Sequence, residues 1–174
     1  RVDSTLGIAG LMECLRRRTV LVANPPGSGV LEGGALMGYL PKLCKHLLNE
    51  PLVLPSIATW WCGEPVAMEE ALDRCENLVF KPADPGFAFN PVFGQNLSPQ
   101  QLQELQQQVT RHPERYVAQE LVEVSQAPIL SGRMRQKFKP RGIGLRVHAS
   151  IAPGGSYVVM PGGLTRVASE TDSR

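Results

Sequence analysis

The chain has 174 residues, of which 43% are hydrophobic, so it is long enough to form one domain or two small lobes with a buried core. Its net charge of +2 is too small to argue for a nucleic-acid partner by itself, and no apolar run approaches the ~20 residues of a membrane-spanning helix. Four cysteines occur without a Cys-x-x-Cys pair. This pattern argues against a zinc site and is typical of reduced thiols, so we expect a cytoplasmic protein.

The first half of the chain is predicted to alternate short helices with extended segments. In chain order we expect a helix at residues 10–18, a buried strand at 19–23, a helical stretch at 35–48, an extended segment at 52–61 and a helix at 65–75. Pro41 should bend or interrupt the helical stretch, because proline removes a backbone hydrogen bond. Pro65 instead suits the first turn of the last helix.

The second half begins with a short strand at residues 78–81, followed by a long irregular piece at residues 82–97. Ser98 can cap the next helix, Pro99 fits its first position, and Gln101 completes a capping box. A strand over residues 116–124 and a hairpin of residues 145–151 and 157–160 are then expected. Because the C-terminal strands are neighbours in sequence, we predict an antiparallel α+β fold rather than a doubly wound parallel sheet.

The segment of residues 19–34, TVLVANPPGSGVLEGG, combines an apolar run with a glycine-rich turn. Bare backbone N–H groups in such a turn can hold a phosphate, which makes Gly27 and Gly29 candidate cofactor-binding residues. Asn24 and Glu32 flank the turn with the oxygen ligands that Mg²⁺ prefers. No Gly-Lys-Ser/Thr closes the turn, so it is not a P-loop, and a purely structural turn is the alternative.

Three polar residues end two of the predicted strands. Lys81 follows an apolar run and precedes a glycine-containing loop, where its ammonium group could reach phosphate oxygens. Alternatively, it simply leaves the core at the end of a strand. Gln119 and Glu120 end the strand that starts at Tyr116, and their side chains could hydrogen-bond the edge of an adenine. Many edge strands end in polar residues, so the alternative is that these two bind no ligand.

Basic residues stand out in the last third of the chain. Arg146 lies within an apolar strand, where a buried guanidinium needs an anionic partner, either a phosphate or carboxylate of a ligand or a structural ion pair. Five basic residues alternate on the preceding strand: Arg133, Arg135, Lys137, Lys139 and Arg141. Period-two spacing puts all five on one face. That face could bind a polyanion, or it could protect a solvated edge strand by charge.

Nine blocks along the chain resemble one known family in the same order: DSTLGIAGL, VANPPGSGVLE, LPSIATWWCGEP, LVFKPA, PVFG, YVAQE, APIL, LRVHA and VMPGGLTRVA. They are similar to the bacterial circularly permuted ATP-grasp proteins, type 2, and span residues 3–168. The wider kin of this family are ATP-grasp ligases such as glutathione synthetase, which join a carboxylate to an amine through an acyl phosphate. The resemblance implies ATP and Mg²⁺ as cofactors and peptide-like small molecules as substrates.

The resemblance also implies a role for each candidate near the nucleotide. Lys81 would contact the phosphates, and Gln119 and Glu120 would lie on the hinge strand beside the adenine. Arg146 would be the catalytic residue that faces the phosphate or acyl-phosphate oxygens.

The permutation would place the opening turn beside the terminal phosphate, with Asn24 and Glu32 near Mg²⁺. ATP-grasp proteins hold ATP between two α+β lobes, and we expect these lobes at about residues 1–76 and 77–174. The chain begins at RVDSTLG, so we expect it to be a fragment of a longer protein that is inactive alone.

The predicted function is therefore ATP- and Mg²⁺-dependent ligation of a carboxylate and an amine into a peptide or amide bond. Gly86 and Gly94 are the only glycines of loop 82–97. A loop so poor in glycine favours a second hypothesis, a catalytically degenerate ATP-grasp fold that acts as an interaction module for a protein partner. A third and less favoured hypothesis is a nucleic-acid binder that uses the basic strand at residues 133–141.

Overall fold

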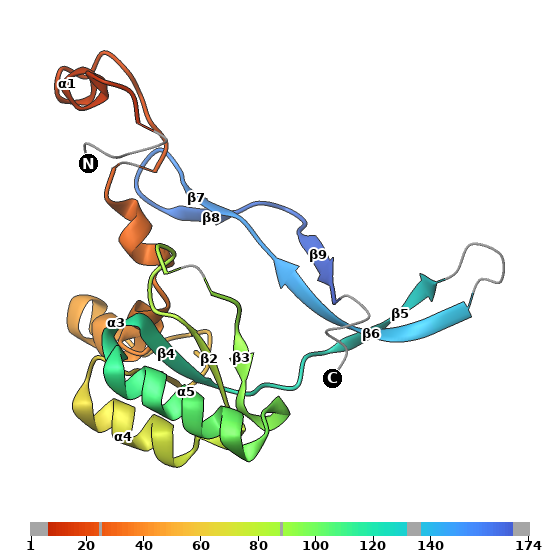
Figure 1. Ribbon diagram of the computed structural model, residues 1–174. Coiled ribbons are helices and arrows are strands. Elements are labelled where there is room, and N and C mark those ends of the chain that lie inside the picture. Colours follow the sequence, from red (N-terminus) through yellow and green to blue (C-terminus); the bar gives the residue numbers. More distant parts are fainter. Residues whose placement is uncertain (1–6, 25, 88, 132–136, 169–174) are drawn as a thin grey trace. The chain divides into compact units, whose positions relative to one another are not determined.

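The computed structural model describes residues 7–24, 26–87, 89–131 and 137–168 (Figure 1). The chain forms two compact units, Arg1–Leu121 and Val122–Arg174. We expected lobes that divide near residue 76. The units instead divide after Leu121, because strand β1 (Thr59–Trp61) pairs with strand β4 (Tyr116–Glu120) in one sheet.

The first unit contains a four-stranded sheet in the order β1-β4-β2-β3. Strand β4 lies between β1 and β2 (Leu78–Pro82), and β2 also pairs with the short strand β3 (Val92–Phe93). All three pairings are antiparallel. The predicted antiparallel α+β class is therefore confirmed.

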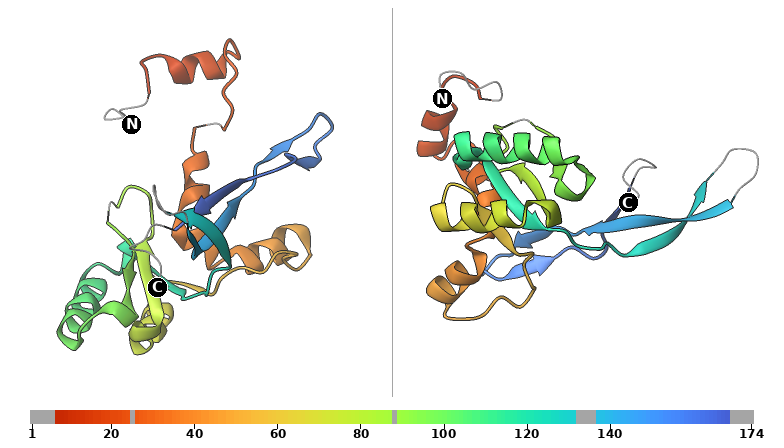
Figure 2. Two further views of the ribbon diagram at one scale, coloured as in Figure 1. Left: turned by 90° about the vertical axis from the view of Figure 1, so that its right-hand side faces the viewer. Right: turned by 60° about the horizontal axis from the view of Figure 1, so that its bottom comes forward.

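One face of this sheet forms the core of the first unit with helices α4 (Pro65–Asp73) and α5 (Pro99–Arg111), which both lie along it (Figures 1 and 2). The buried cluster consists of Cys62, Ala71, Cys75, Leu78, Phe80, Leu105, Val109 and Ala118. Phe80 and Ala118 are cross-strand partners, so their side chains share this face. Burial of apolar surface between the sheet and the two helices is the main force that holds the unit together.

Helix α5 begins at the predicted capping box. The Ser98 hydroxyl accepts a hydrogen bond from the backbone N–H of Gln101 (3.3 Å), and the Gln101 side-chain oxygen accepts from the backbone N–H of Ser98 (2.9 Å). These two bonds satisfy N–H groups that the first turn of a helix leaves without a partner. Leu105 and Val109, four residues apart, are the buried residues of this helix.

We expect Ser98→Ala to lower the free energy of unfolding by about 1 kcal/mol, because alanine cannot accept the bond from the Gln101 N–H. Urea denaturation of the full-length protein measures this loss. Gln107→Ala, on the exposed side of the same helix, is the matched control and should change stability by less than about 0.5 kcal/mol. Equal effects of the two substitutions would show that the capping box contributes nothing to stability.

The N-terminal elements differ from the prediction at one point. Helix α1 (Leu11–Arg16) lies within the predicted helix at residues 10–18, but residues 19–23 form no strand. The prediction of a buried strand there was wrong, since Val20 and Leu21 are exposed. A run of β-formers becomes a buried strand only when a neighbouring strand pairs with it, and no described strand does so here.

The helical stretch at residues 35–48 is divided into α2 (Gly34–Met37) and α3 (Leu40–Leu48). Pro41 lies in the first turn of α3, so the interruption precedes the proline instead of bending one helix. The described residues of the unit also form four short 3₁₀ helices: η1 (Ser28–Glu32), η2 (Cys75–Asn77), η3 (Gly94–Asn96) and η4 (Pro113–Arg115). None of the helices in the described ranges has the length and apolar character that a bilayer span requires.

The second unit is built from antiparallel strands. β6 (Lys137–Arg146) lies between β5 (Gln126–Ser131) and β9 (Leu164–Val167), while β7 (Ala149–Ile151) and β8 (Tyr157–Val159) form the predicted hairpin. Figure 2 shows the β5–β6 ribbon from two further sides.

Two of the predicted strands differ from the structure: one is shorter than predicted, and the other is split into two strands. β4 ends at Glu120 rather than at residue 124, and the strand predicted at residues 145–151 is divided between β6 and β7. Of the alternating basic residues, Lys137, Lys139 and Arg141 lie on β6. Arg133 and Arg135 lie outside the described residues.

Candidate functional site

The second face of the four-stranded sheet carries the candidate site. Two cross-strand rows lie on it, Thr59–Gln119–Val79 and Trp61–Val117–Lys81. Because side chains alternate along a strand, these residues point away from the Phe80 side of the sheet. Lys81 and Gln119 are therefore diagonal neighbours on adjacent strands, close enough for long side chains to meet.

Helix α2 approaches this face closely at two glycines, Gly34 in its first position and Gly38 directly after its end. A Cβ atom on Gly34 would lie 3.0 Å from Val117 Cγ2, and one on Gly38 would lie 2.8 Å from the carbonyl oxygen of Thr59. The backbone N–H of Ala35 donates to the carbonyl oxygen of Ala83 (3.3 Å). The backbone of α2 thus approaches the sheet more closely than side chains at these two positions would allow.

Four side chains form a connected polar cluster between α2 and the sheet. Lys81 Nζ donates to Gln119 Oε1 (2.7 Å), and Gln119 Nε2 donates to Thr59 Oγ1 (3.0 Å) and to Met37 Sδ (3.4 Å). Gln119 is 4% exposed. The structure thus brings together two of the candidates from the sequence, Lys81 and Gln119.

The ammonium group of Lys81 is half-buried, and this burial lowers its pKa below the usual range of a lysine. Within the described residues no carboxylate forms an ion pair with it. Its partner Gln119 is neutral and accepts a hydrogen bond without cancelling the charge. Lys81 can therefore still attract an anion.

The other candidate for adenine recognition, Glu120, is separated from this cluster. As the next residue along β4 it points to the opposite face from Gln119, and it is exposed. Its backbone N–H donates to the carbonyl oxygen of Ala58 (3.0 Å). The carboxylate of Glu120 thus does not join Lys81 and Gln119.

Arg146 belongs to the second unit, where it ends β6 opposite Leu164. We expected a buried guanidinium that requires an anionic partner. Its side chain is exposed instead, so solvent satisfies its charge and no partner is required.

The opening turn has the backbone shape of a tight turn. Gly27 has a φ of 97° and precedes η1, and Asn24 has a φ of 60°, both in the left-handed region. Gly29 lies within η1, with open space around a Cβ position. Glu32 ends η1 and is exposed. The turn therefore presents its polar groups at the surface.

The oxygen atoms of Asn24 and Glu32 suit Mg²⁺ by type, but two side chains do not make a six-coordinate site. Across the described ranges no three His, Cys, Asp or Glu residues gather to hold a metal ion. These residues alone do not fit a complete Mg²⁺ site.

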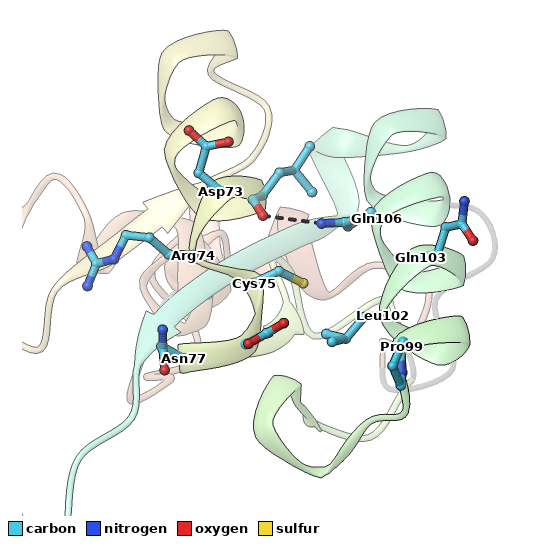
Figure 3. Close-up of a pocket in the computed structure, with 10 residues that line it drawn as sticks. Asp73, Arg74, Cys75, Asn77, Pro99, Leu102, Gln103 and Gln106 are labelled. Carbon is cyan, nitrogen blue, oxygen red and sulfur yellow. Dashed lines mark hydrogen bonds between the residues drawn. The ribbon is translucent and has the colours of Figure 1, made fainter.

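Two hollows of the first unit lie on opposite sides of the sheet. One of about 330 Å³ lies beside α2 and is lined in part by Tyr39, Trp61 and Asp84. The other, of about 530 Å³, lies between α5 and the end of α4 (Figure 3). There Gln106 Nε2 donates to the carbonyl oxygen of Leu72 (3.3 Å). This second hollow lies on the helix-covered side and is not part of the Lys81 site.

The buried thiols of the first unit are poor nucleophiles. Burial raises the pKa of Cys62 to about 11 and also raises the pKa of Cys75, so both remain protonated at neutral pH.

We expect iodoacetamide at pH 8 to alkylate the exposed Cys14 in the native full-length protein while Cys62 and Cys75 stay protected. Mass spectrometry of peptides measures this order. Equal labelling in urea is the control, and rapid native labelling of Cys62 would contradict it.

Two members of the cluster, Thr59 and Met37, were not predicted from the sequence. Thr59 could be placed beside Gln119 only once the register of β1 on β4 was known. For Met37, the spacing of Gly34 and Gly38 around it is a sequence signal for a helix that packs closely.

Comparison with known proteins places the chain in a family. It matches the model of circularly permuted ATP-grasp type 2 over residues 1–168. An uncharacterized protein of Synechocystis sp. is 33% identical over 168 residues, which cover 97% of this chain and 34% of that protein. An uncharacterized protein of Mycobacterium tuberculosis (strain H37Rv) is 34% identical over 174 residues, 100% of this chain and 31% of that protein.

A Frankia alni protein with the name "Putative glutamate--cysteine ligase 2-3" is 32% identical over 160 residues, 91% of this chain and 18% of that protein. The chain spans about a third of the length of the Synechocystis and Mycobacterium relatives. The family model covers nearly the whole chain, and the nine sequence blocks predicted the same assignment. The chain belongs to the circularly permuted ATP-grasp type 2 family.

Proposed function

We propose that this chain is the nucleotide-binding part of an ATP-dependent ligase that joins a carboxylate to an amine, and that Lys81 binds the phosphates of ATP. The observation that carries the proposal is the half-buried ammonium of Lys81, which is hydrogen-bonded to the neutral amide of Gln119. Membership of an ATP-grasp family supports ATP as the nucleotide.

The environment of Lys81 suits an anionic ligand. A partly desolvated cation interacts more strongly with a phosphate than a fully hydrated one does, because the local dielectric constant is lower. The phosphate would also restore part of the charge stabilisation that burial removes, and so raise the pKa of Lys81 again.

The ligase assignment rests on the family and on the printed name of the Frankia relative, of which this chain covers 18%. In such a ligase, ATP supplies the phosphoryl group that activates the carboxylate toward an amine. The protein contributes charge and position rather than a nucleophile. Both Cys62 and Cys75 are protonated and are therefore poor nucleophiles, which agrees with a mechanism that uses no nucleophile from the protein.

The remaining candidates are assigned by the family resemblance. Arg146 would face the acyl phosphate, Glu120 the adenine, and Asn24 and Glu32 part of a Mg²⁺ site, while Gly27 and Gly29 would hold phosphate. Peptide-like small molecules are the proposed substrates. The four free cysteines support a cytoplasmic location.

Titration of the full-length protein with Mg-ATP, followed by thermal unfolding, tests the proposal. ATP at a hundred times its Kd should stabilise the protein by about 2.7 kcal/mol and raise Tm. AMP is the control, because it lacks the β- and γ-phosphates. An unchanged Tm at millimolar Mg-ATP would contradict the proposal.

The loop after Lys81 favours a second candidate, a degenerate fold that binds a protein partner. The backbone N–H of Gly86 donates to Asp84 Oδ1 (2.7 Å), so it is not free for a phosphate. Gly94 is buried, and a Cβ atom there would collide with the carbonyl oxygen of Cys75. Neither glycine thus forms an open phosphate cradle. This candidate predicts an unchanged Tm with ATP, together with one stoichiometric partner that co-purifies with the full-length protein.

A further inference from the structure

We propose that Gln119 is a positioning residue for Lys81, and that helix α2 sets the orientation of Gln119 through Met37. This inference rests on the proposed function of Lys81 as a phosphate ligand. It assigns Gln119 a role different from direct contact with adenine.

The orientation of the Gln119 amide follows from its partners. The hydroxyl of Thr59 has one hydrogen, which it donates to the carbonyl oxygen of Ile57 (2.9 Å). Toward Gln119 the hydroxyl must therefore accept, so Gln119 presents its NH₂ group to Thr59 (3.0 Å). The amide oxygen is left facing Lys81 Nζ (2.7 Å), the direction in which an ammonium group needs an acceptor. Both amide hydrogens of Gln119 then have partners inside the protein, Thr59 and Met37.

Helix α2 is linked to this orientation. Met37 on α2 provides the sulfur that lies 3.4 Å from Gln119 Nε2. Gly34 and Gly38 allow the helix to approach β4 and β1, as their close approach to Val117 and Thr59 shows. A shift of α2 away from the sheet would remove the Met37 contact. Because α2 follows the opening turn after a single residue, the turn and Lys81 are connected through this helix.

A neutral amide suits the positioning of a phosphate-binding lysine. Lysine has a long, flexible side chain, and a hydrogen bond that holds it in place reduces the entropy lost when the ligand binds. A carboxylate in the same place would compete with the phosphate for the ammonium group and raise the pKa of Lys81. Gln119 orients the charge and leaves it available.

The first test measures the titration of Lys81 by NMR of its ¹⁵Nζ in the full-length protein without nucleotide. We expect Gln119→Leu to lower the pKa of Lys81 further, because the acceptor is lost, and Gln119→Glu to raise it above the wild-type value. Thr59→Val should shift the pKa in the same direction as Gln119→Leu but by less, and Thr59→Ser should restore it. A buried glutamine with a merely structural role would leave the titration unchanged.

The second test measures ATP affinity by isothermal titration calorimetry. We expect Gln119→Leu to raise the Kd for Mg-ATP about tenfold, since Lys81 is no longer held. Gly38→Ala should also raise the Kd, because its methyl group would push α2 away from Thr59. Gly144→Ala is the matched control, since a Cβ there meets nothing within 4 Å, and it should leave the Kd unchanged.

The outcomes separate the two proposals. If Gln119→Leu leaves the titration of Lys81 unchanged, or makes ATP bind more tightly, Gln119 does not position Lys81 and the inference is overturned. If wild-type protein binds no ATP while the pKa of Lys81 responds as expected, the hydrogen-bond coupling stands and the proposed function fails. Circular dichroism establishes whether each variant is folded. If Gln119→Leu does not fold, the pKa of Lys81 is compared between Thr59→Val and Thr59→Ser instead.

Discussion

Replacing Lys81 with methionine is expected to weaken the binding of Mg-ATP to the full-length protein by roughly 10- to 100-fold. A hydrogen bond to a charged group contributes about 1.5–3 kcal/mol, and each 1.4 kcal/mol changes Kd tenfold. Methionine keeps an unbranched side chain of similar length, so it fills the half-buried space that the lysine stem occupies. The substitution therefore removes the charge while it retains most of the packing.

Isothermal titration calorimetry measures this loss, and Lys42→Met on the exposed surface of α3 is the matched control. The pH dependence supplies a second check. ATP affinity should fall as rising pH removes the proton from Lys81. Because burial lowers the pKa of Lys81, this fall should begin at a lower pH than it would for an exposed lysine. Lys81→Arg should shift this fall to higher pH, because arginine stays charged. Equal Kd values for the wild-type and Lys81→Met proteins would exclude Lys81 as a ligand.

Replacing Phe80 with alanine is expected to lower the free energy of unfolding by about 3–5 kcal/mol. Phe80 is fully buried in the cluster that the sheet forms with α4 and α5, so the smaller side chain leaves a cavity among packed neighbours. A typical domain is stable by only about 5–15 kcal/mol, so this single change removes a large part of the total.

Urea denaturation of the full-length protein measures the loss as a lower midpoint with an unchanged m-value. Phe93→Ala is the control within the same sheet. Phe93 on the edge strand β3 is 40% exposed, so its removal should cost clearly less than the removal of Phe80. If both substitutions had the same effect, the core would not lie where the structure places it.

These two predictions concern residues that are adjacent in the sequence but affect different properties of the protein, its stability and its affinity for ATP. Phe80 and Lys81 point to opposite faces of β2 because side chains alternate along a strand. Phe80→Ala should therefore reduce stability through the helix-covered face. Lys81→Met should reduce ATP affinity through the other face. Its effect on stability should be smaller than that of Phe80→Ala, because it creates no large cavity and leaves one amide oxygen of Gln119 without its donor.

Local signals in the sequence predicted several elements well. The capping box at Ser98, the proline that begins α4 and the apolar run of β2 all depend on residues within a few positions of one another. The buried strand at residues 19–23 was wrong for the opposite reason. Whether an apolar run becomes a strand depends on a partner that is distant in sequence, and local composition does not report that partner.

The sequence by itself determined the family, since nine ordered blocks extend over nearly the whole chain, and it identified Lys81 and Gln119 as candidates. Only the tertiary structure decided how these candidates are arranged. The register of β2 on β4 joins residues 38 positions apart, so that Lys81 meets Gln119 while Glu120 faces away. Thr59 and Met37 enter the cluster from 60 and 82 positions away. Strand register and helix packing are set by the burial of the whole unit, so no local pattern specifies these contacts.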